Sequence, residues 1–161
     1  RLKEVLDGYQ PAGKLWMVPF AELQKEIVLG APSSLRVILY RRLMARIAER
    51  LAPRVNALAL VTGEALGQVA SQTLSNLTVI EEAATMPILR PLIAYDKSEI
   101  EALAKAIGTY SISIEPDDDC CTFLMPTNPA IHATLEEVRA AESALDMDAM
   151  AQRGADGAAL A

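Results

Sequence analysis

Residues 60–74 decide the fold, and they run Leu60-Val61-Thr62-Gly63-Glu64-Ala65-Leu66-Gly67-Gln68-Val69-Ala70-Ser71-Gln72-Thr73-Leu74. An apolar run over 57–61 stops at Thr62-Gly63, which predicts a buried strand followed by a tight turn. Apolar and small residues then recur at helical spacing, which predicts a helix from Glu64 to Leu77. A strand that turns through glycine into a helix places free backbone N–H groups at the carboxyl edge of a sheet, where anions and nucleotides bind. An ordinary strand–turn–helix unit without a ligand is the alternative.

Strands and helices alternate along the rest of the chain, which indicates an α/β fold with a parallel sheet and helices on both faces. Besides 57–61, strands are expected at 14–20 and 112–114, and 87–92 is expected to be a short extended segment between prolines. Besides 64–77, helices are expected at 21–29, 32–51 (its arginines facing outward), 96–107 and 134–151. The helix at 96–107 has an N-cap at Asp96, a capping box with Glu99 and a stop at Gly108. Residues 1–151 are interpreted as one partial domain and residues 152–161 as a flexible tail.

Composition and net charge limit the classes of function that this chain can have. The chain is 52% apolar and 22% charged, which is typical of a folded globular protein. No apolar run reaches the roughly 18 residues that a membrane span needs, and two adjacent cysteines without a disulfide pattern favour the reducing cytoplasm. The net charge is -6, so this segment by itself gains no counterion-release drive toward nucleic acid.

A loop over 117–122 carries the candidate nucleophiles, Cys120 and Cys121, directly after three aspartates. Neighbouring carboxylates disfavour the thiolate form, so a reactive cysteine here needs a compensating positive group. Small buried thiols in a solvated acidic loop are the alternative. His132 stands alone in the sequence and is expected at the surface, and no metal site is predicted because no ligand spacing is present.

Several segments, in a fixed order from about Trp16 to Pro129, resemble the ThiI family of tRNA 4-thiouridine synthetases, also called tRNA sulfurtransferases. The matching pieces are Val18-Pro19-Phe20, Tyr40 to Met44, Leu60 to Glu64, Gln68 to Leu74, Leu89 to Ile93, Asp96-Lys97, Ile107 to Tyr110 and Asp119 to Thr122. One piece alone is weak evidence, whereas the ordered set is specific.

The resemblance implies the C-terminal part of a PP-loop ATP pyrophosphatase domain, an adenine nucleotide alpha hydrolase-like fold. It implies an enzyme that uses ATP with Mg²⁺ to adenylate uridine 8 of tRNA, after which a cysteine persulfide delivers sulfur. It also implies a link to sulfur supply for the thiazole of thiamine. By position, Arg41, Gly63 and Gln72 match the ATP-contacting residues of the family. Cys121 matches the sulfur-bearing residue, with Cys120 as the alternative.

The resemblance also implies partners outside this chain: tRNA (bound mainly through other modules), a cysteine desulfurase or other persulfide donor, and a sulfur-carrier protein. The unpaired edge of a partial sheet predicts association, such as a homodimer. The Ser-Gly-Gly-x-Asp-Ser phosphate loop is expected before Arg1, and this segment alone is predicted to be inactive.

This chain departs from the family at two positions: Ala65 stands where serine is usual, and Asp117-Asp118 stands where Tyr-Glu is frequent. Two alternatives therefore stay open. One is a different PP-loop adenylating enzyme, and the other is a non-catalytic remnant that binds a nucleotide or a protein partner.

Overall fold

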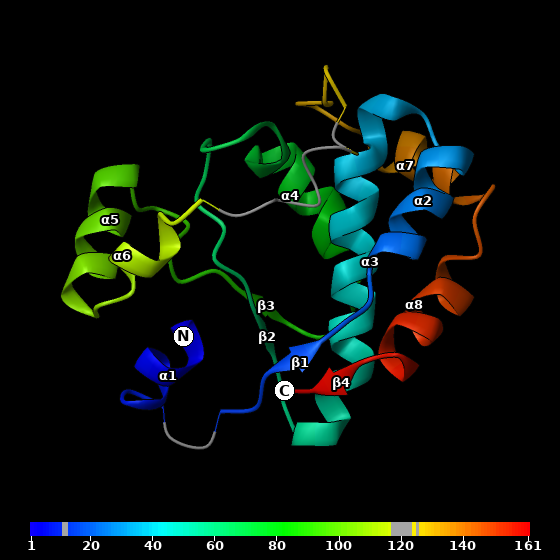
Figure 1. Cartoon of the computed structure of the whole chain (residues 1–161). Coiled ribbons are helices and arrows are strands. Elements are labelled where there is room, and N and C mark those ends of the chain that lie inside the picture. Colours follow the sequence, from blue (N-terminus) through cyan, green and yellow to red (C-terminus); the bar gives the residue numbers. More distant parts are fainter. Residues whose placement is uncertain (11–12, 117–123, 125) are drawn as a thin grey trace.

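The computed structural model describes residues 1–10, 13–116, 124 and 126–161. Helices surround two short strand pairs (Figure 1). The α-helices are α1 (Leu2–Asp7), α2 (Ala21–Gly30), α3 (Arg36–Leu51), α4 (Leu74–Glu81), α5 (Lys97–Ala106), α6 (Tyr110–Ser113), α7 (Leu135–Glu142) and α8 (Met147–Asp156). The strands are β1 (Trp16–Met17), β2 (Leu60–Val61), β3 (Ile88–Leu89) and β4 (Ala159–Leu160), and the 3-10 turns are η1 (Ser33–Leu35), η2 (Ala52–Val55) and η3 (Ala70–Gln72).

Helix α3 is the centre of the core. It packs against α2, α4, α7 and α8, and its Leu39 and Leu43 are completely buried. Gly154 lets α8 approach α3 closely, because a Cβ at this position would lie 2.5 Å from Cδ1 of Ile47. Removing this much apolar surface from water makes α3 the rigid support on which the neighbouring loops are placed.

The two strand pairs differ in direction. β2 and β3 are parallel, with Leu60 opposite Ile88 and Val61 opposite Leu89. β1 and β4 are antiparallel, with Trp16 opposite Leu160. The β2–β3 pair agrees with the predicted parallel sheet, although these strands are shorter than the apolar run at 57–61 and the extended segment at 87–92.

The predicted flexible tail at 152–161 is wrong. Its first half forms the last turns of α8, and Ala159–Leu160 forms β4. The Ala161 N–H also donates to the Leu15 carbonyl at 2.9 Å. Pairing with β1 gives this segment backbone partners that its alanine- and glycine-rich sequence does not reveal.

The predicted helix from Glu64 to Leu77 is also wrong. The chain has no regular structure over 62–69, then forms η3, and α4 begins only at Leu74. Gly67 has a φ of 74°, the left-handed region that interrupts a helix. The Leu66 N–H donates to the Ile93 carbonyl at 3.0 Å rather than within a helix. Thr73 then caps α4 by accepting a hydrogen bond from the Asn76 N–H at 3.3 Å.

Three further expectations are corrected. Residues 112–114 belong mainly to the short helix α6 and form no strand. The predicted helix at 134–151 is two helices, because Asp146 caps a new one by accepting from the Ala149 N–H at 3.0 Å. Arg42 faces inward rather than outward, with its side chain only 1% exposed. The capping box of Asp96 and Glu99 on α5 is confirmed.

Candidate nucleotide-binding site

The loop that follows β2 contains a buried carboxylate, Glu64, which is only 2% exposed. Its Oε2 accepts hydrogen bonds from Thr62 Oγ1 at 2.9 Å and from Arg90 Nε at 2.6 Å. Its Oε1 accepts from Arg41 Nη2. One carboxylate thus joins three elements: the end of β2, the end of β3 and the middle of α3.

Arg41 connects the two loop segments predicted to contact ATP. Its Nη2 donates to Glu64, the residue after Gly63, and its Nη1 donates to Ser71 Oγ at 2.9 Å, the residue before Gln72. The Arg41 side chain is 23% exposed, so it is fixed in place but still reachable. The structure therefore brings all three predicted ATP residues to one corner of the molecule. Their binding of ATP remains a prediction.

Gly63 leaves space for a ligand, and Gln72 has a side-chain oxygen that could accept a hydrogen bond from it. A Cβ built on Gly63 would meet nothing within 4 Å, so this glycine borders open space. The N–H groups of Gly63, Glu64 and Ala65 donate to no described residue. Gln72 Oε1 is buried and has no hydrogen-bond partner among the described residues. Open backbone donors and an orphaned amide oxygen fit a polar ligand such as an adenine nucleotide.

Arg90 is a site residue that the sequence analysis missed. Its Nε donates to Glu64, its Nη1 donates to Glu81 Oε2 at 2.6 Å, and its buried Nη2 has no partner within the described part of the chain. Burial would lower the pKa of Arg90, but the hydrogen bonds and charges of Glu64 and Glu81 outweigh it, so its pKa is raised above the ordinary value. The signal in the sequence was its place directly after the β3 segment, at the same edge as Gly63.

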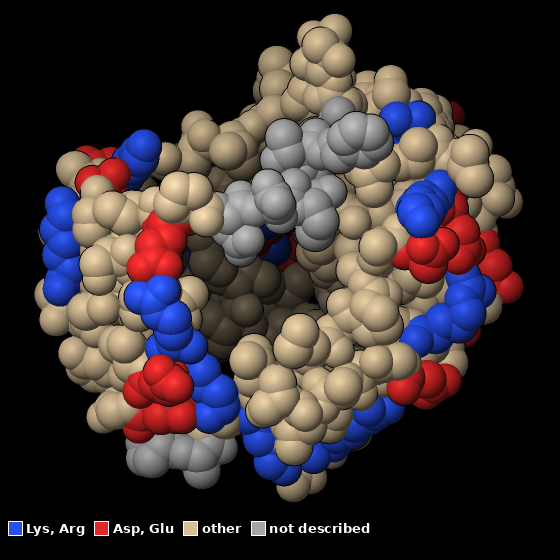
Figure 2. Space-filling view, viewed as in Figure 1, with Lys and Arg blue, Asp and Glu red and all other residues tan. Residues whose placement is uncertain are grey.

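Arg41, Glu64 and Arg90 line a pocket of about 240 Å³ between α3 and the β2–β3 pair, whereas Gly63 and Gln72 are not among its lining residues. Its polar part consists of Arg41, Thr62, Glu64 and Arg90, and its apolar part includes Ala45, Ala48, Ile80 and Ile88. The face drawn in Figure 2 is hollowed near its centre, with basic and acidic side chains on the surrounding surface, and this hollow is not identified with the pocket between α3 and the β2–β3 pair. A cavity with an apolar floor and a few convergent polar groups is typical of a small-molecule site.

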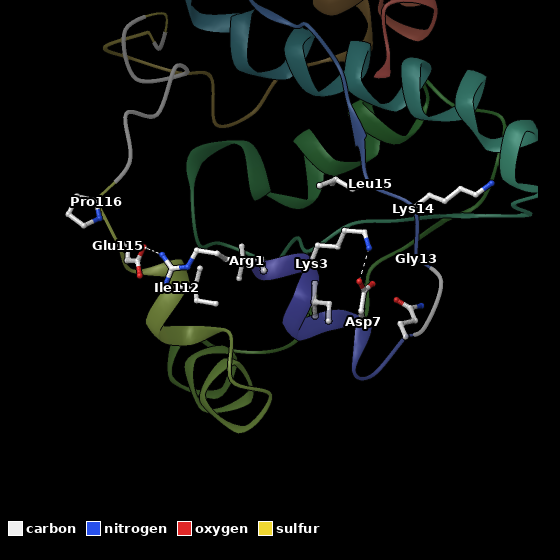
Figure 3. A pocket seen from close by; sticks show the side chains of 12 residues that line it. Arg1, Lys3, Asp7, Gly13, Lys14, Leu15, Ile112, Glu115 and Pro116 are labelled. Carbon is white, nitrogen blue, oxygen red and sulfur yellow. Dashed lines mark hydrogen bonds and ion pairs between the residues drawn. The ribbon is translucent and has the colours of Figure 1, made fainter. Parts of the chain in front are cut away.

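A larger pocket, of about 800 Å³, lies elsewhere, between α1, the start of β1 and the end of α6 (Figure 3). Two ion pairs border it: Arg1 with Glu115, and Lys3 with Asp7 at 2.7 Å. None of the predicted ATP residues lines this pocket. It is therefore separate from the candidate nucleotide site.

The remaining predicted residues divide between the described and undescribed parts of the chain. Cys120 and Cys121 lie outside the described residues, as do Asp117 and Asp118. His132 is exposed as expected, and its Nδ1 lies 3.2 Å from Ser75 Oγ. Among the described residues no three His, Cys, Asp or Glu side chains gather as metal ligands, and none of the helices found there is long and apolar enough to cross a membrane.

Ala65, which stands where the ThiI family usually has serine, is only 2% exposed. Its methyl group therefore packs inside the loop.

Comparison with known proteins identifies the family. The family model described as "Thiamine biosynthesis protein (ThiI)" matches residues 1–147, so the chain belongs to the ThiI family. A probable tRNA sulfurtransferase of Thermus thermophilus is 52% identical over 144 residues, covering 89% of this chain and 36% of the relative. A probable tRNA sulfurtransferase of Moorella thermoacetica is 48% identical over 144 residues, covering 89% and 37%. The chain thus spans little more than a third of the length of these curated relatives.

A solved structure supports the same assignment. The crystal structure of a 4-thiouridine synthetase–RNA complex with bound ATP matches with a TM-score of 0.90 at 39% identity. The match covers 98% of this chain and 42% of that one. At this identity and similarity the α/β PP-loop fold predicted from the sequence is confirmed.

Proposed function

We propose that this chain supplies part of the ATP site in a tRNA sulfurtransferase that forms 4-thiouridine, with Gly63 and Gln72 beside the adenosine and Arg41 facing the phosphates. The observation that carries the proposal is the position of Arg41. It is hydrogen-bonded to the neighbours of both Gly63 and Gln72, at the end of the parallel strands β2 and β3. Support also comes from the relatives, which are described as tRNA sulfurtransferases, and from the matched structure, which is described as having bound ATP.

Each residue of the corner has a chemical role in this proposal. The Arg41 guanidinium meets negative charge on the phosphates. The orphaned Gln72 Oε1 accepts from a donor on adenine or ribose, and the free N–H groups after β2 donate to the ligand. Mg²⁺, which is bound in most ATP sites through phosphate oxygens, would be held mainly by the nucleotide.

The proposed reaction is ATP-dependent thiolation of uridine 8 in tRNA. ATP, when bound, supplies the leaving group by adenylating the carbonyl oxygen of the uridine. The outer sulfur of a persulfide on Cys121, or on Cys120, then bonds to the uridine carbon as AMP leaves, and a second thiol, from another cysteine or a reductant, breaks the S–S bond by forming a disulfide with the persulfide cysteine. The persulfide comes from a cysteine desulfurase or another donor, with a sulfur-carrier protein and a homodimer as further proposed partners. The same sulfur supply is proposed to serve the thiazole of thiamine.

Nucleotide binding by this chain tests the first part of the proposal. When ATP is titrated into the protein, we expect the amide NMR signals of Gly63 and Gln72 to shift. The ATP affinity obtained from these shifts should be at least about tenfold lower in Arg41→Ala, because a charged hydrogen bond is lost. The matched control is Arg153→Ala, an exposed arginine on α8 paired with Glu26 at 2.6 Å. Equal affinities of wild type and Arg41→Ala would exclude Arg41 from the site.

The sulfur transfer is tested in cells that lack their own 4-thiouridine synthetase. We expect the gene that carries this chain to restore 4-thiouridine in tRNA, and Cys121→Ala to abolish it. Loss in Cys120→Ala instead would move the persulfide to Cys120. Failure of the wild-type gene to restore 4-thiouridine would favour a non-catalytic role.

A further inference from the structure

We propose that Glu64 is a positioning residue that acts on the nucleotide through Arg41, an inference that rests on the proposed ATP site. The carboxylate does not meet the ligand itself. Instead it fixes the Arg41 guanidinium in the orientation that phosphate binding requires.

The Glu64 carboxylate is buried, and each of its oxygens is paired with protein donors. Its side chain is 3% exposed, and both of its oxygens already accept hydrogen bonds from protein groups. A buried carboxylate is costly unless it is paired. Because its carboxylate is hidden and each oxygen already accepts from a protein group, Glu64 acts on a ligand through its protein partners rather than by direct contact.

Hydrogen bonds to Ser71 and Glu64 hold the Arg41 guanidinium in place. A guanidinium has five N–H donors in a rigid plane. The contacts to Ser71 and Glu64 use one donor on each terminal nitrogen, so the plane is fixed at two points. The other donors make no hydrogen bond to a described residue, which leaves them for a ligand. Without Glu64, one of the two tethers is lost, and the long side chain gains rotamers that do not face the site.

A neutral amide cannot take the place of the Glu64 carboxylate. Arg41 donates to one oxygen, and Arg90 and Thr62 donate to the other. A glutamine must turn its NH₂ group toward one of these donors, so donor faces donor on one side. Glu64→Gln keeps the shape of the side chain but disturbs the placement of Arg41 or of Arg90.

A double-mutant cycle on ATP affinity tests the inference. We expect Glu64→Gln to weaken ATP binding by about tenfold, the loss of a charge-assisted hydrogen bond. In the Arg41→Ala background the same substitution should change ATP affinity less than about twofold, because the residue through which Glu64 acts is already absent. Affinity for adenosine, which has no phosphate, should change little in either background.

Two further variants keep the test decisive. Glu64→Asp keeps the charge but shortens the side chain by one methylene, which withdraws the carboxylate from Arg41, so it replaces Glu64→Gln in the cycle if that variant does not fold. The matched control is Glu22→Gln, whose side chain is 78% exposed and paired with Lys25 at 2.6 Å. It should bind ATP as the wild type does.

The outcomes separate this inference from the proposed function. If Glu64→Gln (or Glu64→Asp) weakens ATP binding equally with and without Arg41, or weakens adenosine binding as much as ATP binding, Glu64 is not a positioning residue for Arg41. If Arg41→Ala weakens ATP binding but Glu64→Gln does not, only the inference about Glu64 is wrong. If the wild type binds no ATP, the proposed function fails and this inference fails with it.

Discussion

Replacing Glu142 by glutamine tests how the core of this protein tolerates a buried arginine. The Arg42 side chain is 1% exposed, and its Nε and Nη2 donate to the two oxygens of Glu142 at 2.8 and 3.0 Å. Arg46 donates to the same two oxygens at 2.7 and 3.0 Å. Glu142 therefore accepts four hydrogen bonds from two arginines and joins α7 to α3. Glu142→Gln keeps the volume of the side chain but removes its charge.

The magnitude follows from what remains around Arg42. Breaking a buried ion pair from one side costs about 3–5 kcal/mol. Arg42 keeps the Val79 carbonyl and the Glu82 carboxylate, the latter at 2.9 Å, so we expect the lower end, about 3 kcal/mol at pH 7. For a domain of this size that corresponds to a fall in Tm of about 6–12 °C.

The effect depends on pH in a defined direction. Burial would raise the pKa of Glu142, but hydrogen bonds from Arg42 and Arg46 and their positive charge outweigh it, so its pKa is lowered in the folded protein. A lowered carboxylate pKa contributes stability above the unfolded pKa of about 4.3. That contribution is lost as the pH falls through the folded value. The free energy of unfolding of the wild type should therefore exceed that of Glu142→Gln by a constant amount from pH 7 to about pH 5. This difference should shrink at lower pH.

Urea unfolding measures this difference, followed by circular dichroism and by the fluorescence of the single tryptophan, Trp16. The control is Glu136→Gln on the same helix, an exposed residue for which we expect a change within about 0.5 kcal/mol. A loss below about 1 kcal/mol in Glu142→Gln, or a gap that persists undiminished at pH 3, would refute the reasoning. A small loss would mean that the other partners of Arg42 satisfy it, and an undiminished gap would mean that protonation of Glu142 is not coupled to folding.

Three other predictions concern local structure. Asn76→Ala should lower the free energy of unfolding by about 3 kcal/mol, because its fully buried amide donates to the Ala70 and Ala130 carbonyls and accepts from the Ala133 N–H at 2.8–2.9 Å. An unchanged urea midpoint would contradict this prediction. Asp96→Ala should cost about 1 kcal/mol by removing the capping box of α5, with faster hydrogen exchange in its first turn as the local sign. Deleting residues 158–161 removes β4 and should speed amide exchange of β1 by at least about tenfold, whereas equal exchange would show that the strands do not pair in solution.

Local signals in the sequence were sufficient where the structure depends on neighbouring residues. The start of α5 was predicted because Asp96 and Glu99 satisfy each other's backbone three residues apart. The long central helix and the parallel relation of β2 and β3 followed from apolar periodicity and from the alternation of elements. The corner of Arg41, Gly63 and Gln72 was found through resemblance, and the contacts of Arg41 bring these three residues together.

Long-range contacts explain the expectations that were wrong. The spacing of apolar residues after Gly63 indicated a helix, but Gly67 adopts a left-handed φ and Leu66 bonds across to Ile93. Arg42 looked like a solvent-facing cation, yet two acidic side chains, from α7 and from just after α4, allow it to be buried. The partners Ile93, Glu82 and Glu142 lie far from these positions along the chain, so short-range spacing does not reveal them.

The same distinction holds for the candidate site. The sequence by itself determined the family, the α/β class and the glycine turn at which a nucleotide is proposed to bind, because short-range spacing and residue type carry that information. Only the tertiary structure decided that Glu64 is buried between Arg41 and Arg90. Those partners lie 23 and 26 positions away along the chain, and only the packing of α3 against β2 and β3 brings them together.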